Sequence, residues 1–361
     1  MIPLNKPYFD EEEVEAVRKV LQSGWVAQGP MCEAFEKAVA KYLNCNYVIS
    51  VTNCTSALFL ALKALGVGPG NEVICPDFTF PATPLAILAS GATPVLVDVN
   101  MYSYNIDADK IERAITSRTK AIVPVHLFGR SAPMIKIMEI AKQYDLKVIE
   151  DAACALGASY EGRMLGTIGG IGCFSLHARK GITTGEGGLI ATNSAVLANR
   201  MKRASNFGIE RTFGRVGPVQ FSQFGFNFKM SDIAAAIGLV QLSRIEKTIR
   251  ARREQAVIWG KIIATDSFLS ERITAPLWHA KEDILQAYVC RCAVGQRQAV
   301  VDYMREKGFE TGVGTYACHT HPAFYMNRLL PNSAYLAENC ISLPVWYGLD
   351  LQKEWDKGGE I

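Results

Sequence analysis

Long apolar runs, clusters of basic residues and low-complexity tracts are all missing from this sequence. Its apolar stretches are interrupted well before the roughly 18 residues of a membrane-spanning helix, so we expect no membrane span. A formal charge of only +3 across 361 residues, without any basic run, argues against nucleic acid as a partner. The N-terminal segment turns acidic and lacks the apolar core of a signal peptide, so we expect a cytoplasmic protein.

Ten cysteines are present, but the CxxC spacing and the spacings of zinc-ligand clusters are absent. The pair His319-x-His321 has no carboxylate nearby in the sequence. We therefore interpret it as a substrate contact or plain structure, and we expect no metal. Several cysteines lie in apolar or glycine-rich surroundings: Cys45, Cys54, Cys75, Cys154 and Cys173. These surroundings are typical of buried free thiols in a reducing cytosol.

The composition, 49% hydrophobic and 20% charged, is that of an ordinary soluble globular enzyme. A chain of 361 residues is too long for one simple core and predicts two domains. We place a large domain at residues 1–245 and a small C-terminal domain at 246–361. Residues 1–30 are expected to form an N-terminal arm near the small domain or the active site.

From residue 46 to residue 204, short apolar strands alternate with helices. The expected strands are 47–51, 72–75, 94–97, 121–125, 147–149, 171–175 and 189–192. The expected helices are 55–65, 80–89, 107–115, 132–144 and one that ends at 204. This alternation predicts a largely parallel sheet with helices on both faces. Ligands of such sheets gather at the carboxyl ends of the strands, which selects the residues to consider.

Further elements flank this region. The helices 10–22 and one ending at 43 come first, and the Gly-rich turn between them contains Trp25, either a packing anchor or the wall of a pocket. Residues 206–226 predict a long loop. A long helix then begins near 231 and runs past 250 into a charged, exposed portion. A strand 288–293, a helix 297–306 and a strand 310–313 predict a small α+β domain.

Two strand ends carry polar groups that suit a charged ligand. The segment 50–56 leads straight into a helix, and backbone amides and hydroxyls at a helix N-terminus favour a phosphate. Thr55 or Asn53 could instead only cap that helix. Asp151 follows the strand 147–149, where a carboxylate is expensive to bury unless it meets a positive partner. The alternatives for Asp151 are a solvated loop carboxylate and a structural ion pair.

A third strand end leads into Lys180, which stands before the glycine-rich run Thr183–Gly188. Lysine chemistry with a carbonyl needs a neutral amine. A pocket supplies it by desolvating the ammonium or by placing positive charge nearby, here Arg179. The glycines let a bound ring or phosphate approach the main chain closely. Taken alone, Lys180 could equally be a surface lysine before an ordinary turn.

A phosphate-binding helix start, an aspartate and a lysine at strand ends together suit pyridoxal 5′-phosphate (PLP). That cofactor has a phosphate, an aldehyde that a lysine holds as an imine, and a ring nitrogen that a carboxylate keeps protonated. Phe80, at the end of the run Pro76–Phe80, is placed to cover the ring. These residues predict a PLP enzyme.

Longer motifs make the sequence resemble the DegT/DnrJ/EryC1/StrS family of PLP-dependent nucleotide-sugar aminotransferases, nearly end to end. The motifs that carry the resemblance are SGWVAQGP, GNEVICPDFTFPAT, GATPVLVDVN, TKAIVPVHLFG, VIEDAACALGA, CFSLHARKGITTGEGG, GFNFKMSDIAAAIGLVQL and the weaker SLPV. The resemblance implies an α/β protein of fold type I, like aspartate aminotransferase, with a mostly parallel central sheet. It also implies a homodimer whose active sites are shared between subunits.

The same resemblance implies roles for individual residues. Lys180 would be the Schiff-base lysine and proton carrier, Asp151 would pair with the ring nitrogen, and Phe80 would stack on the ring. The phosphate would be held by the Cys54 amide, Thr55, Ser175 and, from the neighbouring subunit, Asn227. Many members carry Gln or His where Cys154 stands, beside the cofactor's phenolic oxygen. Because a thiol is a poor hydrogen-bond donor, we expect water or another residue to make that contact.

The intact Lys180 argues for transamination by a ping-pong cycle. L-Glutamate would donate the amine, and a nucleotide-diphosphate keto-deoxysugar, most simply a 4-keto-6-deoxysugar, would accept it. The predicted substrate contacts are Lys6, Trp25, Glu186, Lys229 and His319. The cationic ones would meet the diphosphate, and the alternative for each is a solvated surface charge. Other hypotheses are a PLP-dependent sugar dehydratase or lyase, an aminocyclitol (inosose) aminotransferase, and a PLP-binding sensor.

Overall fold

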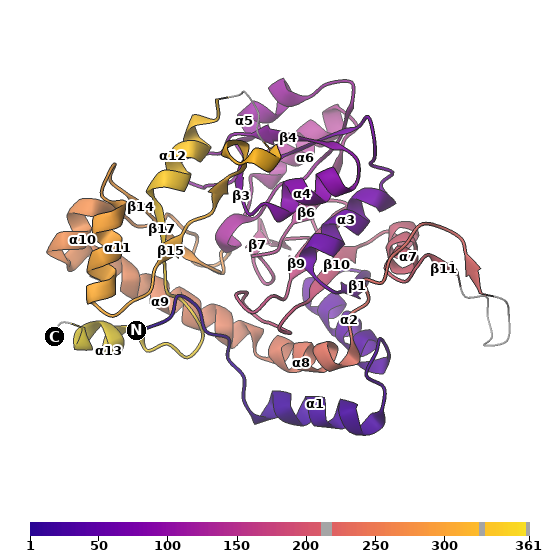
Figure 1. Ribbon diagram of the computed structural model, residues 1–361, viewed down its shortest axis with the longest axis horizontal. Helices are drawn as coiled ribbons and strands as arrows, with labels where there is room; N and C mark the ends of the chain where they lie inside the picture. Colours follow the sequence, from indigo (N-terminus) through magenta and orange to yellow (C-terminus); the bar gives the residue numbers. More distant parts are fainter. Residues whose placement is uncertain (211–218, 325–328, 359–361) are drawn as a thin grey trace.

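The structure is a computed structural model that describes residues 1–210, 219–324 and 329–358. A central sheet of seven strands forms the body of the molecule, and a second, smaller sheet lies beside the long helix α9, Ile245–Thr265 (Figure 1).

The seven strands of the central sheet lie in the order β1-β10-β9-β6-β5-β2-β4. Their bounds are β1 Tyr47–Val51, β2 Glu72–Pro76, β4 Thr93–Val97, β5 Thr119–Ile122, β6 Lys147–Asp151, β9 Ile171–Ser175 and β10 Gly188–Thr192. Strands β9, β6, β5, β2 and β4 pair in parallel, whereas β10 is antiparallel to both of its neighbours. The predicted mostly parallel sheet is confirmed.

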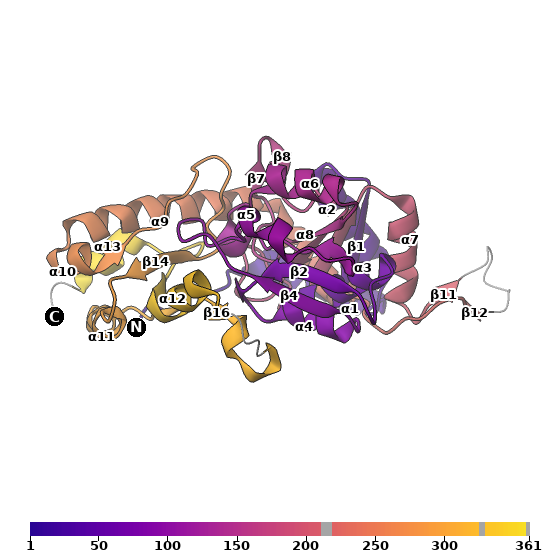
Figure 2. The same ribbon diagram turned by 90° about the horizontal axis from the view of Figure 1, so that it is seen from above.

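Helices cover both faces of this sheet, because its strands are apolar on both sides. One face packs against α2 (Pro30–Leu43), α6 (Met134–Gln143) and α8 (Asp232–Ser243). The other packs against α3 (Cys54–Ala64), α4 (Ala82–Ala89) and α7 (Ala195–Ala204). Figure 2 shows the sheet between these two layers.

The C-terminal part has its own antiparallel sheet, in the order β13-β14-β17-β15, and its own apolar core around Trp259, Tyr288 and Phe309. Its elements are α9 Ile245–Thr265, α10 Ser267–Arg272, β13 Ile273–Thr274, β14 Tyr288–Cys292, α11 Arg297–Glu306, β15 Gly312–Val313, α12 Pro331–Asn339, β17 Cys340–Leu343 and α13 Leu351–Lys357. The expected continuous helix from 231 past 250 is two helices, α8 and α9, that break at Arg244. The division of the chain at residue 245 stays a prediction.

Shorter elements complete the described chain. They are α1 Glu11–Ser23, β3 Phe78–Thr79, α5 Ala108–Ile111, η1 Glu112–Ala114, η2 Leu127–Gly129, β7 Ser159–Tyr160, β8 Arg163–Met164, β11 Ile209–Glu210, β12 Gln220–Phe221, β16 Tyr316–Ala317, η3 Cys318–Thr320 and η4 Pro322–Phe324. The expected loop 206–226 therefore contains the paired strands β11 and β12, and its residues 211–218 lie outside the described residues. No helix among the described residues is both long and apolar enough to span a membrane.

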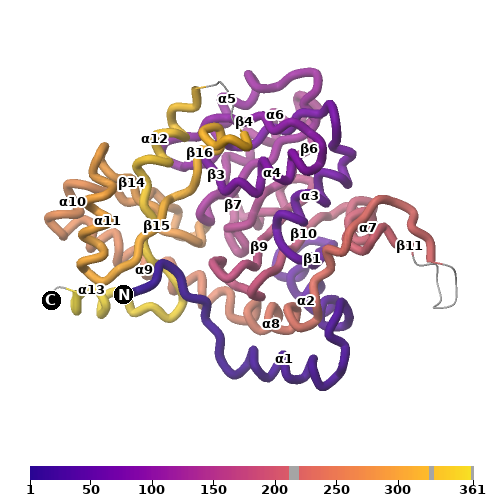
Figure 3. The backbone as a smooth tube through the Cα atoms, in the orientation of Figure 1, coloured from indigo at the N-terminus to yellow at the C-terminus, as the bar shows by residue number. Residues whose placement is uncertain are grey.

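The segment before α1 runs from the small sheet to the main body, as the tube in Figure 3 shows. Ile2 forms a parallel bridge with Phe309, and its N–H donates to the Gly308 carbonyl at 2.7 Å. Three residues further on, the Asn5 side chain donates to the Ala178 carbonyl at 3.1 Å. This N-terminal segment therefore contacts both the small sheet and the loop that carries Lys180.

A buried carboxylate joins the helices α2 and α8. Asp232, the first residue of α8, accepts hydrogen bonds from the backbone N–H groups of Gly29, Met31 and Cys32 at 2.7–3.1 Å. These are donors at the start of α2, which have no partner within that helix. Asp232 therefore caps a helix that is distant in sequence.

We predict that Asp232→Ala destabilises the protein strongly, because it leaves three backbone donors, one buried and two half-buried, without an acceptor. An unsatisfied buried donor costs about 1–3 kcal/mol, so we expect the free energy of unfolding to fall by about 3 kcal/mol or more in urea unfolding. Asp302→Ala, at a more exposed carboxylate on α11, is the matched control and should change stability by about 0.5 kcal/mol or less. Similar losses in the two variants would contradict the capping role.

Candidate active site

Asp151 ends β6 at the carboxyl edge of the sheet, and its carboxylate is buried. The Thr83 hydroxyl donates to its Oδ2 at 2.6 Å, and the Ala153 N–H donates to its Oδ1 at 3.1 Å. Burial raises the pKa of this carboxyl, although these hydrogen bonds oppose the shift. Among the described residues, Asp151 is therefore neither solvated nor held in an ion pair within 4 Å, the two alternatives that the sequence left open.

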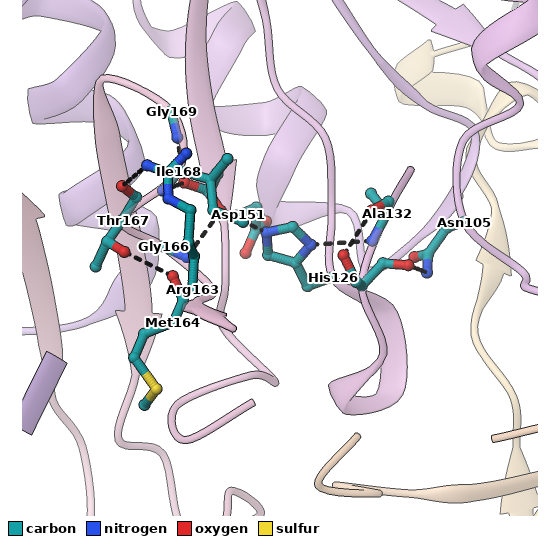
Figure 4. Close-up of polar contacts among 12 residues, drawn as sticks. Asn105, His126, Ala132, Asp151, Arg163, Met164, Gly166, Thr167, Ile168 and Gly169 are labelled. Carbon is teal, nitrogen blue, oxygen red and sulfur yellow. Dashed lines mark hydrogen bonds and ion pairs between the residues drawn. The ribbon is translucent and has the colours of Figure 1, made fainter. Parts of the chain in front are cut away.

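A second buried carboxylate, that of Glu150, anchors the strand just before Asp151. It accepts three backbone N–H groups from the turn 166–169 at 2.6–2.8 Å, and it lies 2.9 Å from Nε2 of His126. Because the Ala132 N–H donates to Nδ1 of His126, that ring carries its proton on Nε2 and donates it to Glu150. Figure 4 shows His126 between Ala132 and the turn. The network leaves the end of β6 little freedom.

The amine of Lys180 is buried and lies 3.2 Å from the sulfur of Cys154. Burial, the largest single influence, lowers the pKa of the amine, but Cys154, Cys54 and Asp151 together raise it by more, so the net shift is upward. The expectation that burial or Arg179 makes the amine neutral is therefore wrong for the cofactor-free chain. Arg179 is exposed to solvent instead.

The hydroxyl of Thr55, at the start of α3, takes no part in capping the helix. The side chain of Asn53 caps the helix by accepting the Ser56 N–H at 2.8 Å, while Thr55 is exposed and makes no cap. Gly188 lies so close that a Cβ there would meet the Asn53 carbonyl carbon at 2.3 Å. The absence of a side chain at Gly188 thus lets the loop after Lys180 approach the start of α3. Thr55 remains available for a phosphate.

Phe80 lies beside residues from the C-terminal part of the chain. Its side chain is 64% exposed, and its ring centroid is 6.3 Å from that of Tyr316. Strand β3 pairs with β16 in this region, and the buried Asp77 accepts the His319 N–H at 2.7 Å. The Nδ1 of His319 lies 2.6 Å from the other oxygen of Asp77. The ring of His319 is therefore held by a carboxylate next to Phe80.

Four of the remaining predicted residues fall into two separate groups, one around His177 and one around Lys229. Ser175 and Glu186 both contact His177: the Ser175 hydroxyl accepts its N–H at 3.3 Å, and the Glu186 carboxylate lies 3.7 Å from its Nε2. The Lys229 amine donates to the side-chain oxygen of Asn227 at 2.7 Å, and the Lys229 backbone forms a bridge with Val51, the last residue of β1.

Lys6 lines a pocket that also includes Lys180. Trp25 is 58% exposed on the turn after α1. Among the contacts between described residues, none joins Trp25, Asn227 or Lys229 to the Lys180 amine. Within a single subunit, therefore, these three predicted residues do not contact the Lys180 amine among the described residues.

Two site residues escaped sequence reasoning. Thr83, which holds Asp151, lies within the PDFTFPAT run but gave no signal by itself, because a threonine near a helix start is usually a local cap. Arg252 lies in the portion of α9 that we expected to be exposed. Instead its side chain is buried, and its Nη2 donates to the Lys180 carbonyl at 3.3 Å. Only the packing of α9 against the Lys180 loop shows this.

The arrangement fits the three groups by which a protein holds PLP: the aldehyde, the ring nitrogen and the phosphate. A buried lysine amine suits the aldehyde, a buried carboxylate with only hydroxyl and amide partners suits a protonated ring nitrogen, and an exposed threonine at a helix start suits the phosphate. Phe80 offers an exposed aromatic face at the same edge of the sheet. No group of three or more His, Cys, Asp or Glu in the described part of the chain is arranged to hold a metal ion.

The fold and this site define a PLP-dependent aminotransferase of fold type I. The family model for the DegT/DnrJ/EryC1/StrS aminotransferases matches residues 7–354, and the chain belongs to that family. The predicted family, enzyme class and cofactor are confirmed.

Relatives match along nearly their whole length. The spore coat polysaccharide biosynthesis protein SpsC of Bacillus subtilis is 34% identical over 363 residues, which covers 96% of this chain and 92% of SpsC. The aminotransferase TlmJ of Streptoalloteichus hindustanus superimposes with a TM-score of 0.92 at 32% identity, over 100% of this chain and 97% of TlmJ. Spr1654 of Streptococcus pneumoniae in its PLP form gives a TM-score of 0.90 at 27% identity, over 99% and 97% of the two chains.

The raised pKa of Asp151 predicts that the carboxylate destabilises the cofactor-free protein at neutral pH. When a carboxyl has a higher pKa in the folded than in the unfolded state, the folded protein becomes less stable as the pH rises above the carboxyl's ordinary pKa of 3.8. Asp151→Asn should therefore be more stable than the wild type at pH 8. The advantage should shrink as pH falls toward 4. Chemical unfolding of both cofactor-free proteins across this range measures it, and a constant difference would contradict the assignment.

Proposed function

We propose that the enzyme moves the amino group of L-glutamate onto a nucleotide-linked keto-deoxysugar, a 4-keto-6-deoxysugar, by a ping-pong mechanism. The observation that carries the proposal is the buried Lys180 amine at the same sheet edge as Asp151 and Thr55. The similarity to SpsC, which is named for polysaccharide biosynthesis, supports a sugar acceptor.

Lys180 is proposed as the residue that holds the cofactor and moves the proton. When bound, PLP supplies an electron sink for the carbon that gains or loses the amine. The Nζ of Lys180 then acts as general base and general acid. The hydrogen bond to the Cys154 sulfur at 3.2 Å orients this amine.

Asp151 is proposed to bind the protonated ring nitrogen. Thr83 and Ala153 already occupy one lone pair on each oxygen, and they orient the carboxylate. A positive ring nitrogen would give the buried carboxylate an opposite charge in direct contact, whereas among the described residues the Lys180 amine acts on it only from beyond ion-pair distance. Thr55, the Cys54 amide and Ser175 are proposed to hold the phosphate, and Phe80 to cover the ring.

The sugar nucleotide is proposed to contact residues at the rim of the site. One of them is His319, whose ring is fixed by Asp77, and Tyr316 of the same C-terminal segment lies beside Phe80. The other proposed contacts are Lys6, Trp25, Glu186 and Lys229. Cys154 stands where many family members have glutamine or histidine. Its sulfur accepts a hydrogen bond from the Lys180 amine.

A homodimer is proposed to complete each site through Asn227 of the second subunit. Within one chain, Asn227 lies beside Lys229 and does not meet Lys180. The nearby segment 219–226 exposes large apolar side chains: Val219 59%, Phe221 69%, Phe224 57% and Phe226 47%. Neighbouring exposed apolar residues of this kind favour an interface with another chain.

We predict that L-glutamate changes the absorbance of the PLP-loaded enzyme from the aldehyde form of the cofactor to the amine form. A nucleotide 4-keto-6-deoxysugar should restore the first spectrum, because the two half-reactions run in turn. Lys180→Ala should lose both changes, whereas Lys37→Ala, at an exposed lysine on α2, should keep them. If L-glutamate does not change the spectrum of the wild-type enzyme, the lyase hypothesis is favoured instead.

Shared sites predict complementation between two inactive variants. A mixed dimer of Lys180→Ala and Asn227→Ala subunits contains one site in which both residues are intact. After the two proteins are unfolded and refolded together, activity should return to about a quarter of the wild-type value, because half the dimers are mixed and each has one good site. The two variants refolded separately are the controls. Activity that stays at their level would contradict a site that includes the second subunit's Asn227.

A further inference from the structure

A buried positive charge without a counter-charge in the described chain lies directly behind the Lys180 loop. The guanidinium of Arg252 donates through Nη1 to the carbonyls of Gln286 at 2.5 Å and Leu285 at 3.4 Å, and through Nη2 to that of Lys180 at 3.3 Å. Its Nε is buried and has no hydrogen-bond partner in the described part of the chain. Burial lowers the pKa of Arg252 to about 10.

Carbonyl oxygens satisfy hydrogen bonds but do not neutralise a charge. A buried ion without an opposite charge is costly unless something compensates it. Arg244, a second buried arginine of this region, shows the contrast, since it forms ion pairs with Asp10, Glu12 and Glu13 at 2.8–3.4 Å. Arg252 has no carboxylate within 4 Å among the described residues.

A pocket adjoins Arg252, and its described lining carries no carboxylate. The lining residues that matter here are Lys6, Tyr8, Lys180, Arg244, Arg252 and Tyr347. Lys6 forms no ion pair with the described residues, and its amine lies 5.9 Å from the Trp346 ring centroid. The pocket therefore places two cations without acidic partners beside phenol side chains.

We propose that this pocket between the N-terminal segment and the Lys180 loop binds a small anion of the halide or carboxylate class. The charges of Lys6 and Arg252 attract it, and the Arg252 Nε–H, which has no partner among the described residues, supplies a hydrogen-bond donor. The bound anion neutralises the buried guanidinium. Because Lys6 belongs to the N-terminal segment and Lys180 to the loop, the anion also ties these two segments together.

Two sources could provide such an anion. One is a free ion from solution, and the other is a carboxylate of the amino donor, since the pocket adjoins Lys180. The second source rests on the proposed function, whereas the anion site itself does not.

Bromide is the probe, because its anomalous scattering separates it from water. In crystals of the PLP-loaded enzyme grown with sodium bromide, we expect an anomalous peak within hydrogen-bonding distance of the Arg252 Nε and near the Lys6 amine. The same crystals soaked with excess L-glutamate distinguish the sources: loss of the peak assigns the site to the donor's carboxylate, and its persistence assigns the site to a free anion. A pocket that holds only water in both crystals overturns the proposal.

Thermal unfolding gives an independent test in solution. Sodium bromide or acetate should raise Tm by about 3 °C or more in a saturable way, beyond the effect of a bulky sulfonate at the same ionic strength. Lys6→Gln should need about tenfold more bromide for half of this rise, because one of the two attracting charges is gone. Lys6→Arg should restore the affinity, and Lys37→Gln, at an exposed lysine distant from the pocket, should match the wild type.

Arg252 itself can be tested by Arg252→Lys, which keeps the charge but removes Nε. If this variant folds, it should lose the saturable rise in Tm, and if it does not fold, the Lys6 pair decides. An equal rise in the wild type and Lys6→Gln would show a general salt effect and overturn the site. Failure of L-glutamate to act as donor, with the bromide peak present, would refute only the proposed donor.

Discussion

The burial of the Asp151 carboxylate at the carboxyl edge of the central sheet is the constraint on which the rest of the site depends. Burial raises the pKa of this carboxyl, and the charged form weakens the cofactor-free fold. The surrounding structure compensates by holding it in place: Thr83 binds one oxygen, and the Glu150–His126 network fixes the strand behind it. Such a carboxylate is poised to meet a positive ring nitrogen, where its charge becomes favourable.

Segments from both ends of the chain contact the same edge of the sheet. His319 binds Asp77 beside Phe80, Arg252 of α9 binds the Lys180 carbonyl, and Asn5 binds the Ala178 carbonyl. Each of these contacts joins residues more than 70 positions apart in the chain. Two segments outside the central sheet, the N-terminal segment and α9, thus position the loop of the reactive lysine.

Much of this organisation was predictable from sequence periodicity. Strands β1 and β9 have the bounds expected from their apolar runs. Asp151 is the last residue of β6, which runs two residues beyond the expected strand 147–149, and Lys180 follows the end of β9. Apolar strands in alternation with helices can bury both faces only in a sheet of this kind, so the carboxyl edge was the place to look. The sequence offered Asn53 and Thr55 as possible caps of α3, and the structure shows that Asn53 is the cap.

What local pattern determined is therefore the type of fold, the family and the residues at the strand ends, because these depend on short-range periodicity and on motifs. Only the tertiary structure decided which groups surround them. The pKa of Lys180 is raised by Cys154, 26 positions away, rather than lowered by its neighbour Arg179. Arg252 lies in the charged stretch of α9 but is buried, and no pattern in the sequence predicted its burial. Charge interactions depend on distance and burial in three dimensions, and the order of residues along the chain does not contain either quantity.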